Sequence, residues 1–339
     1  MTDAVKVIEG EVKSGNRIAT FAKREIGRVL ALASLVVIFI FFTIMRPVFA
    51  SWENVSGGIL MSTTVIGLMA IGTTFVIITG GIDLSIGTAT ALVAVIVGKL
   101  VEGLNLNVWT GILVGIIVGG LCGVINGLLI TILKLPPFIA TLATMKAAQG
   151  LALIISDLKP VLFTTDVPGW DAIATGNIIP NLPNGVLILF AAAIVASIIL
   201  NKTVLGRYTF AIGSNSEATK LSGVKVDRWL VAIYALCGFF VGLSAIVMTS
   251  RLGSAQPDLG LGYELEAIAA VIIGGTSLLG GKGTISGTII GALIMSVLIN
   301  GLRILELQQE WQYVVVGIVI LLAVYGDNVR RRRAGESTN

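Results

Sequence analysis

Long apolar stretches separated by short polar connections dominate the sequence. A helix needs about 20 consecutive apolar residues to cross the hydrocarbon core of a bilayer, within a range of roughly 17 to 25. Stretches near this length recur along the chain, so we expect an all-α polytopic membrane protein with about ten transmembrane helices. The predicted spans cover residues 29–48, 56–79, 85–101, 108–133, 138–156, 184–200, 229–250, 266–280, 285–302 and 312–326.

The composition agrees with a membrane protein. Of the 339 residues, 55% are hydrophobic and 12% are charged, and the mean hydropathy is +0.96. A soluble fold of this size has too little interior to bury so much apolar surface. The chain has no histidine, and its two cysteines, Cys122 and Cys237, lie in apolar stretches. We therefore expect neither a disulfide framework nor a metal site, and no cofactor on this chain.

The basic residues predict how the helices are oriented. With both termini in the cytoplasm, most of the 23 Lys and Arg residues fall on the inner side, whereas the 19 Asp and Glu residues divide almost evenly. The first apolar stretch follows a polar segment and precedes many others, which is not typical of a cleaved signal peptide. We expect a cytoplasmic N-terminal segment over 1–28, a transmembrane domain over 29–326 and a basic cytoplasmic tail over 327–339 that contains the arginines at 330–333.

Two connections are long enough to have a binding role of their own. The predicted outer connection, 157–185, contains four prolines, and the inner connection, 201–228, contains no stretch apolar enough to insert. Within the inner connection, the polar segment 214–220 (SNSEATK) predicts a short helix capped by Ser214 or Ser216. A simple solvated connector is the alternative interpretation of this loop.

Glycines recur at every fourth position in two of the predicted spans, which brings them onto one face of each helix. In membrane proteins such faces let two helix backbones approach closely. Residues 124–128 (VINGL) also resemble 298–302 (LINGL), and these copies lie five spans apart. The two copies would cross the membrane in opposite directions, as in an inverted five-plus-five repeat of a transporter. The glycines are Gly111, Gly115, Gly119, Gly123 and Gly127, then Gly283, Gly287 and Gly291.

Four polar residues in or beside the spans are candidates for the translocation pathway or its gating. Asp83 precedes the third span, where it either caps a helix or takes part in gating or subunit contact. Lys146 falls near the middle of the fifth span, and a buried ammonium is normally directed into a cavity or toward a partner. Asn126 and Asn300 either bond between helices or line the pathway.

The sequence gives no sign that the chain hydrolyses ATP itself. A phosphate-binding loop needs G-x-x-x-x-G-K-[ST], but around Lys282 the first glycine is replaced by Thr276, and Gly283 stands at the Ser/Thr position. Ion-coupled transporters generally carry titratable groups deep in the membrane, whereas Glu264 and Glu266 lie near a predicted span end. A separate energy-supplying subunit is therefore favoured over a secondary transporter, and a membrane scaffold explains neither the repeat nor the long inner loop.

Several separated motifs resemble the ribose/xylose/galactoside-type permeases of bacterial ABC importers, the monosaccharide branch of binding-protein-dependent transport. The resemblance extends over about residues 55–326, with one departure at Gln149, where the family has a basic residue before the glycine. The motifs, in order, are 80–87 (GGIDLSIG), 123–127 (GVING), 135–142 (LPPFIATL), 206–208 (GRY), 211–215 (AIGSN), 221–223 (LSG), 273–277 (IGGTS) and 280–284 (GGKGT).

The resemblance implies a permease subunit of the bacterial inner membrane, which forms a pathway for a small neutral sugar and is not itself an enzyme. It further implies a second permease subunit in a homodimer, a cytoplasmic ABC ATPase that binds ATP and Mg, and an external substrate-binding protein. ABC permeases for branched-chain amino acids or nucleosides remain alternatives. The inner loop would form the coupling helix, with Gly206, Arg207, Gly213, Asn215, Glu217, Ala218, Ser222 and Gly223 as matching residues.

Overall fold

The computed structural model describes residues 29, 31–104, 107–162 and 167–333. The predicted N-terminal segment 1–28 and the last residues of the predicted tail lie outside this range. The described residues form helices and connecting loops, with the isolated bridges Val161–Ala255 and Ile179–Leu182 as their only β-pairing. The fold is therefore all-α, as predicted.

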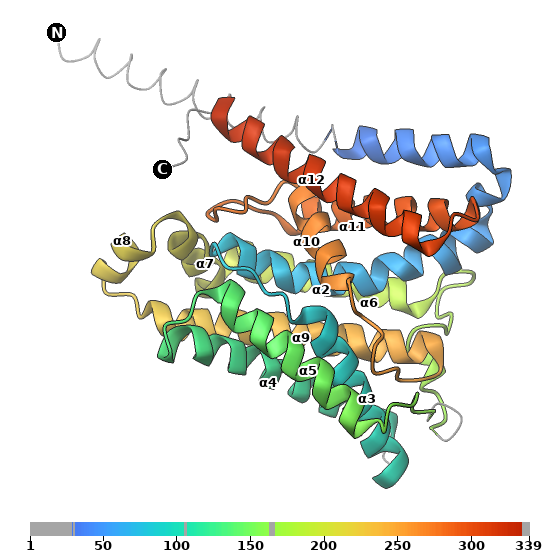
Figure 1. Ribbon diagram of the computed structural model, residues 1–339, viewed down its shortest axis with the longest axis horizontal. Coiled ribbons are helices and arrows are strands. Elements are labelled where there is room, and N and C mark those ends of the chain that lie inside the picture. Colours follow the sequence, from blue (N-terminus) through green and yellow to red (C-terminus); the bar gives the residue numbers. More distant parts are fainter. Residues whose placement is uncertain (1–28, 30, 105–106, 163–166, 334–339) are drawn as a thin grey trace.

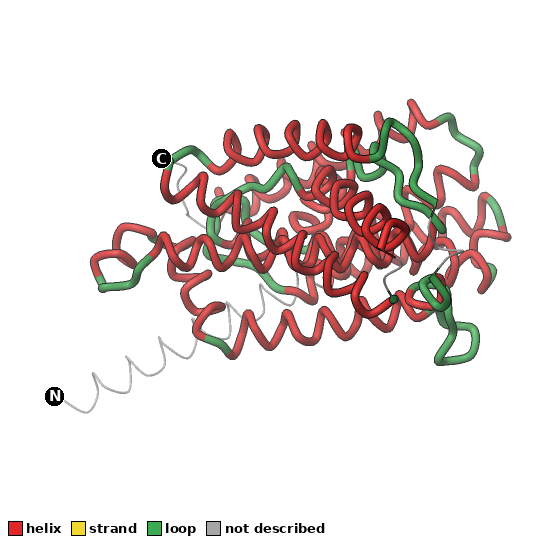
Figure 2. Tube along the Cα trace, turned by 90° about the horizontal axis from the view of Figure 1, so that it is seen from below, coloured by secondary structure: helices red, strands yellow, loops and turns green. Residues whose placement is uncertain are grey.

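The helices run side by side along the long axis of the molecule (Figures 1 and 2). A 3-10 helix, η1, and a π-helix, η2, connect the first long helix to the second, and η2 continues directly into α2. In chain order the elements are Ala31–Met45, η1 (Pro47–Ala50), η2 (Asn54–Leu60), α2 (Met61–Ile78), α3 (Ile86–Leu104), α4 (Val108–Ile132), α5 (Pro137–Ile155), η3 (Asp171–Ile173), α6 (Asn184–Lys202), α7 (Val204–Ser214), α8 (Ser216–Leu221), α9 (Val226–Leu252), α10 (Tyr263–Ile273), α11 (Ile285–Ile304) and α12 (Gln309–Arg333).

Eight of these helices are long and apolar enough to cross a membrane, and each coincides with a predicted span. The helix Ala31–Met45 is shorter. The largest difference concerns the predicted span 266–280, where α10 has only 11 residues and a turn follows it. Gly275, Gly280 and Gly281 have positive φ in this turn, a conformation that ends a helix. Non-helical backbone is tolerated in a membrane only where protein or a water-filled cavity covers it.

The connections alternate between the two ends of the molecule. We call the end with α7 and α8 the inner end and the opposite end the outer end, following the predicted orientation. At the inner end, the Lys134 ammonium lies 2.9 Å from the Asp227 carboxylate, which joins the α4–α5 connection to the first turn of α9. At the outer end, the Val161 amide donates to the Ala255 carbonyl over 2.8 Å. This alternation is the one expected for helices that cross a bilayer in turn.

The helix pairings follow the predicted inverted repeat. In the repeat, α4 corresponds to α11 and α2 corresponds to α9, because the members of each pair lie five spans apart. Helix α4 packs against α9, and α11 correspondingly packs against α2. Likewise α3 contacts α5 and α9, while α10 contacts α12 and α2. In the central pair, α2 is buried on nearly all sides and α9 over most of its length, and the Ser244 hydroxyl of α9 donates to the Val65 carbonyl of α2 over 3.1 Å.

Gly119, Gly123 and Gly127 of α4 lie directly against the backbone of α9, whereas Gly111 and Gly115 face the side chains of Trp170 and Ile246. A Cβ atom on Gly119 would meet the carbonyl oxygen of Gly238 and would lie 2.7 Å from the amide nitrogen of Gly242. Gly123 faces the Tyr234 carbonyl in the same way. The two helices approach so closely that no side chain fits between them.

The glycines of α11 have a different neighbour. Gly287 packs against the backbone of Gly274, and Gly291 packs against the Ala270 carbonyl, both in or just after α10. The two halves of the repeat therefore share their helix pairings, but their glycine faces contact different partners. The last three glycines of the α4 face contact α9, whereas those of α11 contact α10 and the residue after it. A Cβ atom on Gly283, which precedes α11, would instead lie 2.7 Å from the side chain of Ile78.

The variant Gly119→Val is expected to lower the free energy of unfolding by about 1–3 kcal/mol, because the new side chain overpacks the α4–α9 contact. Gly120 provides a matched control, since nothing lies within 4 Å of its Cβ position and Gly120→Val carries the same helix-propensity cost. The measurement is the midpoint of thermal unfolding in detergent. Equal midpoints for the two variants would contradict the packing described here.

Candidate functional site

The inner loop 201–228 forms two helices, α7 and α8, that project from the inner end (Figure 1). Thr203 caps α7 by accepting a hydrogen bond from the Gly206 amide over 3.4 Å. The short polar helix predicted at 214–220 is present as α8, but its cap is Asn215, whose Oδ1 accepts from the Ala218 amide over 2.8 Å. The predicted cap at Ser214 or Ser216 is wrong, because these residues end α7 and begin α8.

The surface of this segment carries charges of both signs and one prominent apolar side chain. Arg207, Glu217 and Lys220 are exposed, and Leu221 at the end of α8 is 89% exposed. Beside them a groove of about 530 Å³ lies between α7 and the start of α9. Such a surface has the mixed character of a protein–protein interface, with an apolar anchor inside a polar rim.

Three glycine-containing segments meet where α7 ends, and we call this contact the inner junction. A Cβ atom on Gly213 would contact the carbonyl oxygen of Ile78, the last residue of α2, and would lie 2.6 Å from the amide nitrogen of Gly281. The Gly281 amide in turn donates to the Ile78 carbonyl over 2.8 Å. The ends of α2 and α7 and the α10–α11 turn are therefore joined through their backbones.

A second group of polar residues links α4 and α5 to the segment that precedes α3. The Asp83 carboxylate is buried and accepts from the amide and the hydroxyl of Ser85, over 2.9 and 2.7 Å. The Asn126 side-chain amide lies 3.3 Å from Oδ2 of Asp83 and donates to the Ser85 hydroxyl over 2.8 Å. The Thr144 hydroxyl donates to Oδ1 of Asn126 over 2.6 Å. These residues form the Asp83 network.

The Asp83 network differs from the simple helix cap that is one prediction for Asp83. The residues 79–85 run back along the bundle before α3 begins (Figure 1). Asp83 bonds to Ser85 within this segment instead of to the first amides of α3, and Asn126 reaches it from another helix. Because a buried carboxylate is costly unless it is bonded, the network holds α3, α4 and α5 in one arrangement.

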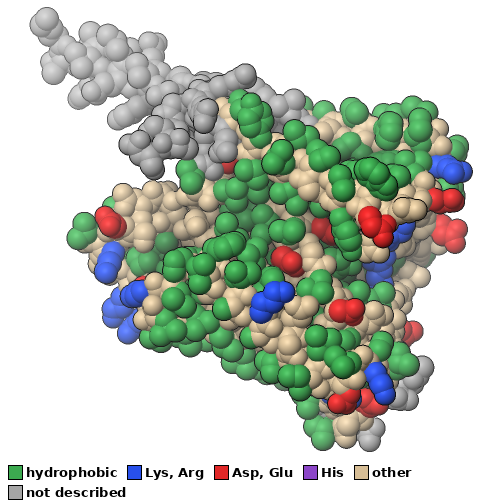
Figure 3. Space-filling model, in the orientation of Figure 1, with side chains coloured by type: hydrophobic (Ala, Val, Ile, Leu, Met, Phe, Trp, Pro, Cys, Tyr) green, Lys and Arg blue, Asp and Glu red, His purple; other side chains and the backbone are tan. Residues whose placement is uncertain are grey.

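The other two candidate residues lie apart from this network. Asn300 and Asn54 exchange two side-chain hydrogen bonds of 3.0 and 3.1 Å, which join α11 to η2. Lys146 is exposed on α5, where its ammonium donates to the Gln149 side chain over 3.2 Å. Figure 3 shows isolated charged side chains within the largely apolar surface that this side of the molecule presents. A charge at this position normally faces water or a partner.

Sequence reasoning identified Gly213 but not its partners in the inner junction, Ile78 and Gly281. The available signal was the pair of glycines that follows each of two spans, Gly80 and Gly81 after α2 and Gly280 and Gly281 after α10. Sequence alone also gave no sign that the first part of the inner loop would form the helix α7.

The fold is that of a multi-pass membrane protein of the transporter class. Its helices pack closely through glycines, and the helix pairings of the first half recur in the second half. Residues 56–324 match the family described as Branched-chain amino acid transport system / permease component, and the chain belongs to this family. Its glycine-rich packing and its half-length helix α10 are thus features of a transport permease. No solved structure matches the chain.

Curated relatives match nearly the whole chain. The ribose import permease protein RbsC of Bacillus subtilis (strain 168) is 44% identical over 305 residues, which cover 90% of this chain and 92% of that protein. RbsC of Haemophilus influenzae is 39% identical over 310 residues, covering 90% and 95%. The L-arabinose transport system permease protein AraH of Escherichia coli (strain K12) is 36% identical over 308 residues, covering 89% and 90%.

The variant Asn126→Leu is expected to lower the free energy of unfolding by about 1–3 kcal/mol, because it removes the amide that joins Asp83 to Thr144 and leaves the buried carboxylate bonded to Ser85 alone. Asn201, exposed at the end of α6, serves as control, and Asn201→Leu should change stability by no more than about 0.5 kcal/mol. Thermal unfolding in detergent provides the comparison. A midpoint for Asn126→Leu that matches the control would show that the Asp83 network does not stabilise the bundle.

Proposed function

We propose that this chain is the membrane-spanning permease subunit of an ATP-driven importer and forms the translocation pathway for a monosaccharide. The observation that carries this proposal is the match over nearly full length to permeases for ribose and L-arabinose. The fructose import permease protein FrcC of Rhizobium meliloti is also similar, at 35% identity. Although the family takes its description from branched-chain amino acid transport, these relatives favour a sugar over an amino acid or a nucleoside.

The energy source in this proposal is a cytoplasmic ABC ATPase that binds ATP and Mg and is seated on α7 and α8. Support comes from the exposed Arg207, Glu217 and Leu221, which provide charged and apolar contacts on one projecting segment. An external binding protein delivers the sugar at the outer end. Both termini lie in the cytoplasm in this proposal.

The inner junction explains how movement of α7 would reach the membrane-spanning helices. At Gly213 the backbone of α7 touches that of α2, and Gly281 connects both to the turn before α11. Backbone contacts of this kind have no flexible side chain to absorb a displacement. A shift of α7 and α8 on the ATPase is therefore passed to α2, in the centre of the bundle, and to the α10–α11 turn.

The pathway itself lies between two copies of the chain in this proposal. The exposed face of α5 combines Lys146 with apolar residues such as Phe138 and Leu151. A lysine facing lipid at this depth would be costly, and a second permease subunit would give it an aqueous pathway to line. Asp83, Asn126 and Asn300 are buried and hydrogen-bonded, so we assign them to holding the helices that surround the pathway.

The proposal is tested by uptake of radiolabelled D-ribose, D-fructose and L-arabinose into cells that express this chain with its ATPase and binding protein. We expect ATP-dependent uptake of at least one of these sugars. The double variant Arg207→Glu with Glu217→Lys should lose uptake and co-purify less ATPase, because it reverses two charges of the proposed contact.

The variant Lys159→Glu reverses an exposed charge at the outer end and should leave ATPase association unchanged. Uptake that persists after inactivation of the ATPase would contradict the importer. Unchanged association of the ATPase with the double variant would contradict the docking site on α7 and α8.

A further inference from the structure

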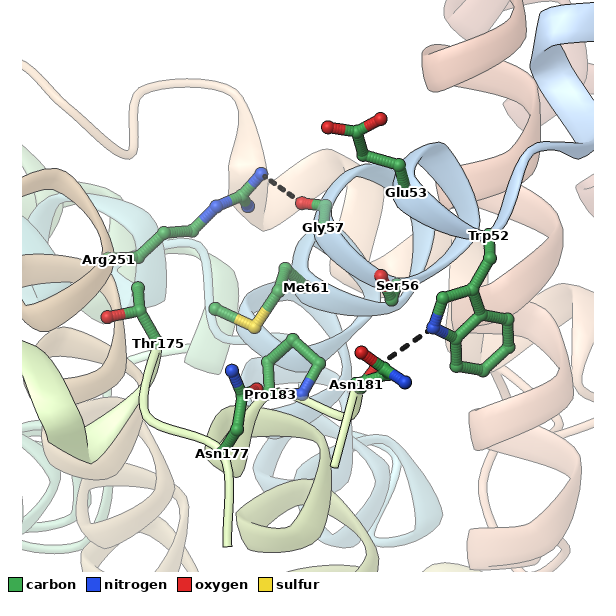
Figure 4. Close-up of a pocket in the computed structure, with 10 residues that line it drawn as sticks. All are labelled: Trp52, Glu53, Ser56, Gly57, Met61, Thr175, Asn177, Asn181, Pro183 and Arg251. Carbon is green, nitrogen blue, oxygen red and sulfur yellow. Dashed lines mark hydrogen bonds between the residues drawn. The ribbon is translucent and has the colours of Figure 1, made fainter. Parts of the chain in front are cut away.

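A cavity of about 400 Å³ opens at the outer end, among segments that are far apart in the sequence (Figure 4). The residues around η2 form one side, the outer loop forms a second and the end of α9 forms a third. Trp52 and Arg251 lie on opposite sides of the cavity, with Met61 and Pro183 between them (Figure 4). Its volume falls in the range of small-molecule sites, about 300–1,000 Å³.

The backbone around this cavity is irregular on two of its sides. The π-helix η2 contributes Ser56 and Gly57. Such π-helical turns are rare in proteins, and those that occur are often found at functional sites. Asn181 in the outer loop has a φ of 63°, in the left-handed region. The Trp52 indole N–H donates to the Asn181 carbonyl over 3.0 Å, which ties these two sides together.

The side chains of the cavity combine an aromatic surface with hydrogen-bonding groups of both kinds. The Trp52 side chain is 55% exposed. The side chains of Glu53, Asn177 and Asn181 make no hydrogen bond within the part of the chain that the structure describes, so their donors and acceptors are open to a ligand. The Arg251 guanidinium is held by the Ser62 hydroxyl and the Gly57 carbonyl, at 3.3 and 3.4 Å.

This combination fits a small neutral polyol better than an ion. One carboxylate and one guanidinium give the cavity no net charge, and the guanidinium is already engaged by Ser62 and Gly57, so a neutral ligand is favoured over an anion, a cation or a zwitterion. The hydroxyl groups of a sugar both donate and accept, as the carboxylate and the two amides require. The indole provides an apolar surface for the C–H face of a sugar ring.

We propose that this cavity is a monosaccharide-binding subsite at the outer end of the permease, which holds the sugar after it leaves the binding protein. The inference rests on the proposed function and adds a place where the permease itself contacts its substrate. Trp52 stacks on the sugar ring, and Glu53 and Asn177 bond its hydroxyl groups. The site is open to solvent, so it binds weakly and releases the sugar toward the pathway.

The test is saturation-transfer difference NMR with the permease in nanodiscs, without binding protein, using D-ribose, D-fructose and L-arabinose as probes. We expect transfer to at least one sugar above that of empty nanodiscs. Trp52→Ala should weaken binding roughly tenfold, and Trp52→Phe should retain most of it. Trp311 is another exposed tryptophan, at the start of α12, and Trp311→Ala should leave the signal unchanged.

Absence of transfer to all three sugars, or equal transfer in Trp52→Ala and Trp311→Ala, would overturn the subsite. Asn177 is exposed and Asn177→Ala removes no bond within the described chain, so this variant repeats the test if Trp52→Ala fails to fold. Loss of binding-protein association in Trp52→Ala, with sugar transfer unchanged, would assign the cavity to docking and overturn the proposal. Sugar uptake by the unaltered permease is measured in parallel. If a sugar is taken up but shows no saturation transfer, the subsite is refuted while the proposed import function stands.

Discussion

The contact between the backbones of α4 and α9 is the constraint on which the rest of the structure depends. In a bilayer there is little hydrophobic gain from bringing two apolar helices together, so close packing must supply the association. Glycines at every fourth position of α4 provide it, because Gly119 and Gly123 let α9 approach within backbone contact. With α9 fixed against α4, α2 is enclosed in the centre, and α2 together with α11 covers the half-length helix α10.

A glycine also allows close backbone contact at the inner end, where the contact joins α7 to α2. Gly213 brings α7 into backbone contact with α2, and α7 also packs against α6 and α9, whereas α8 projects from the inner end. In the proposed importer, a rigid contact of this kind lets a movement of α7 outside the membrane shift helices inside it. In our account, α2 is the helix that receives this movement, because it touches α7 at its end and α9 and α11 along its length.

Much of the fold could be predicted because lipid imposes a simple length rule on helices. That rule located eight of the crossing helices, and the four-residue spacing of Gly111 to Gly127 predicted the packing face of α4. It failed for α10, because apolar residues continue past Ile273 while glycines end the helix. Contacts that depend on the folded chain, such as Asn126 with Asp83 or Trp52 with Asn181, carried no readable signal in the sequence.

In the proposed mechanism, coupling of α7 to α2 runs through the backbone contact at Gly213. Its most direct test is the number of sugar molecules transported per ATP hydrolysed by the reconstituted transporter, compared between Gly213→Ala and Gly120→Ala. A methyl group at Gly213 meets the Ile78 carbonyl, whereas one at Gly120 meets open space. We predict that Gly213→Ala lowers this ratio while the ATPase remains bound, and that Gly120→Ala does not. An unchanged ratio in Gly213→Ala would contradict the account.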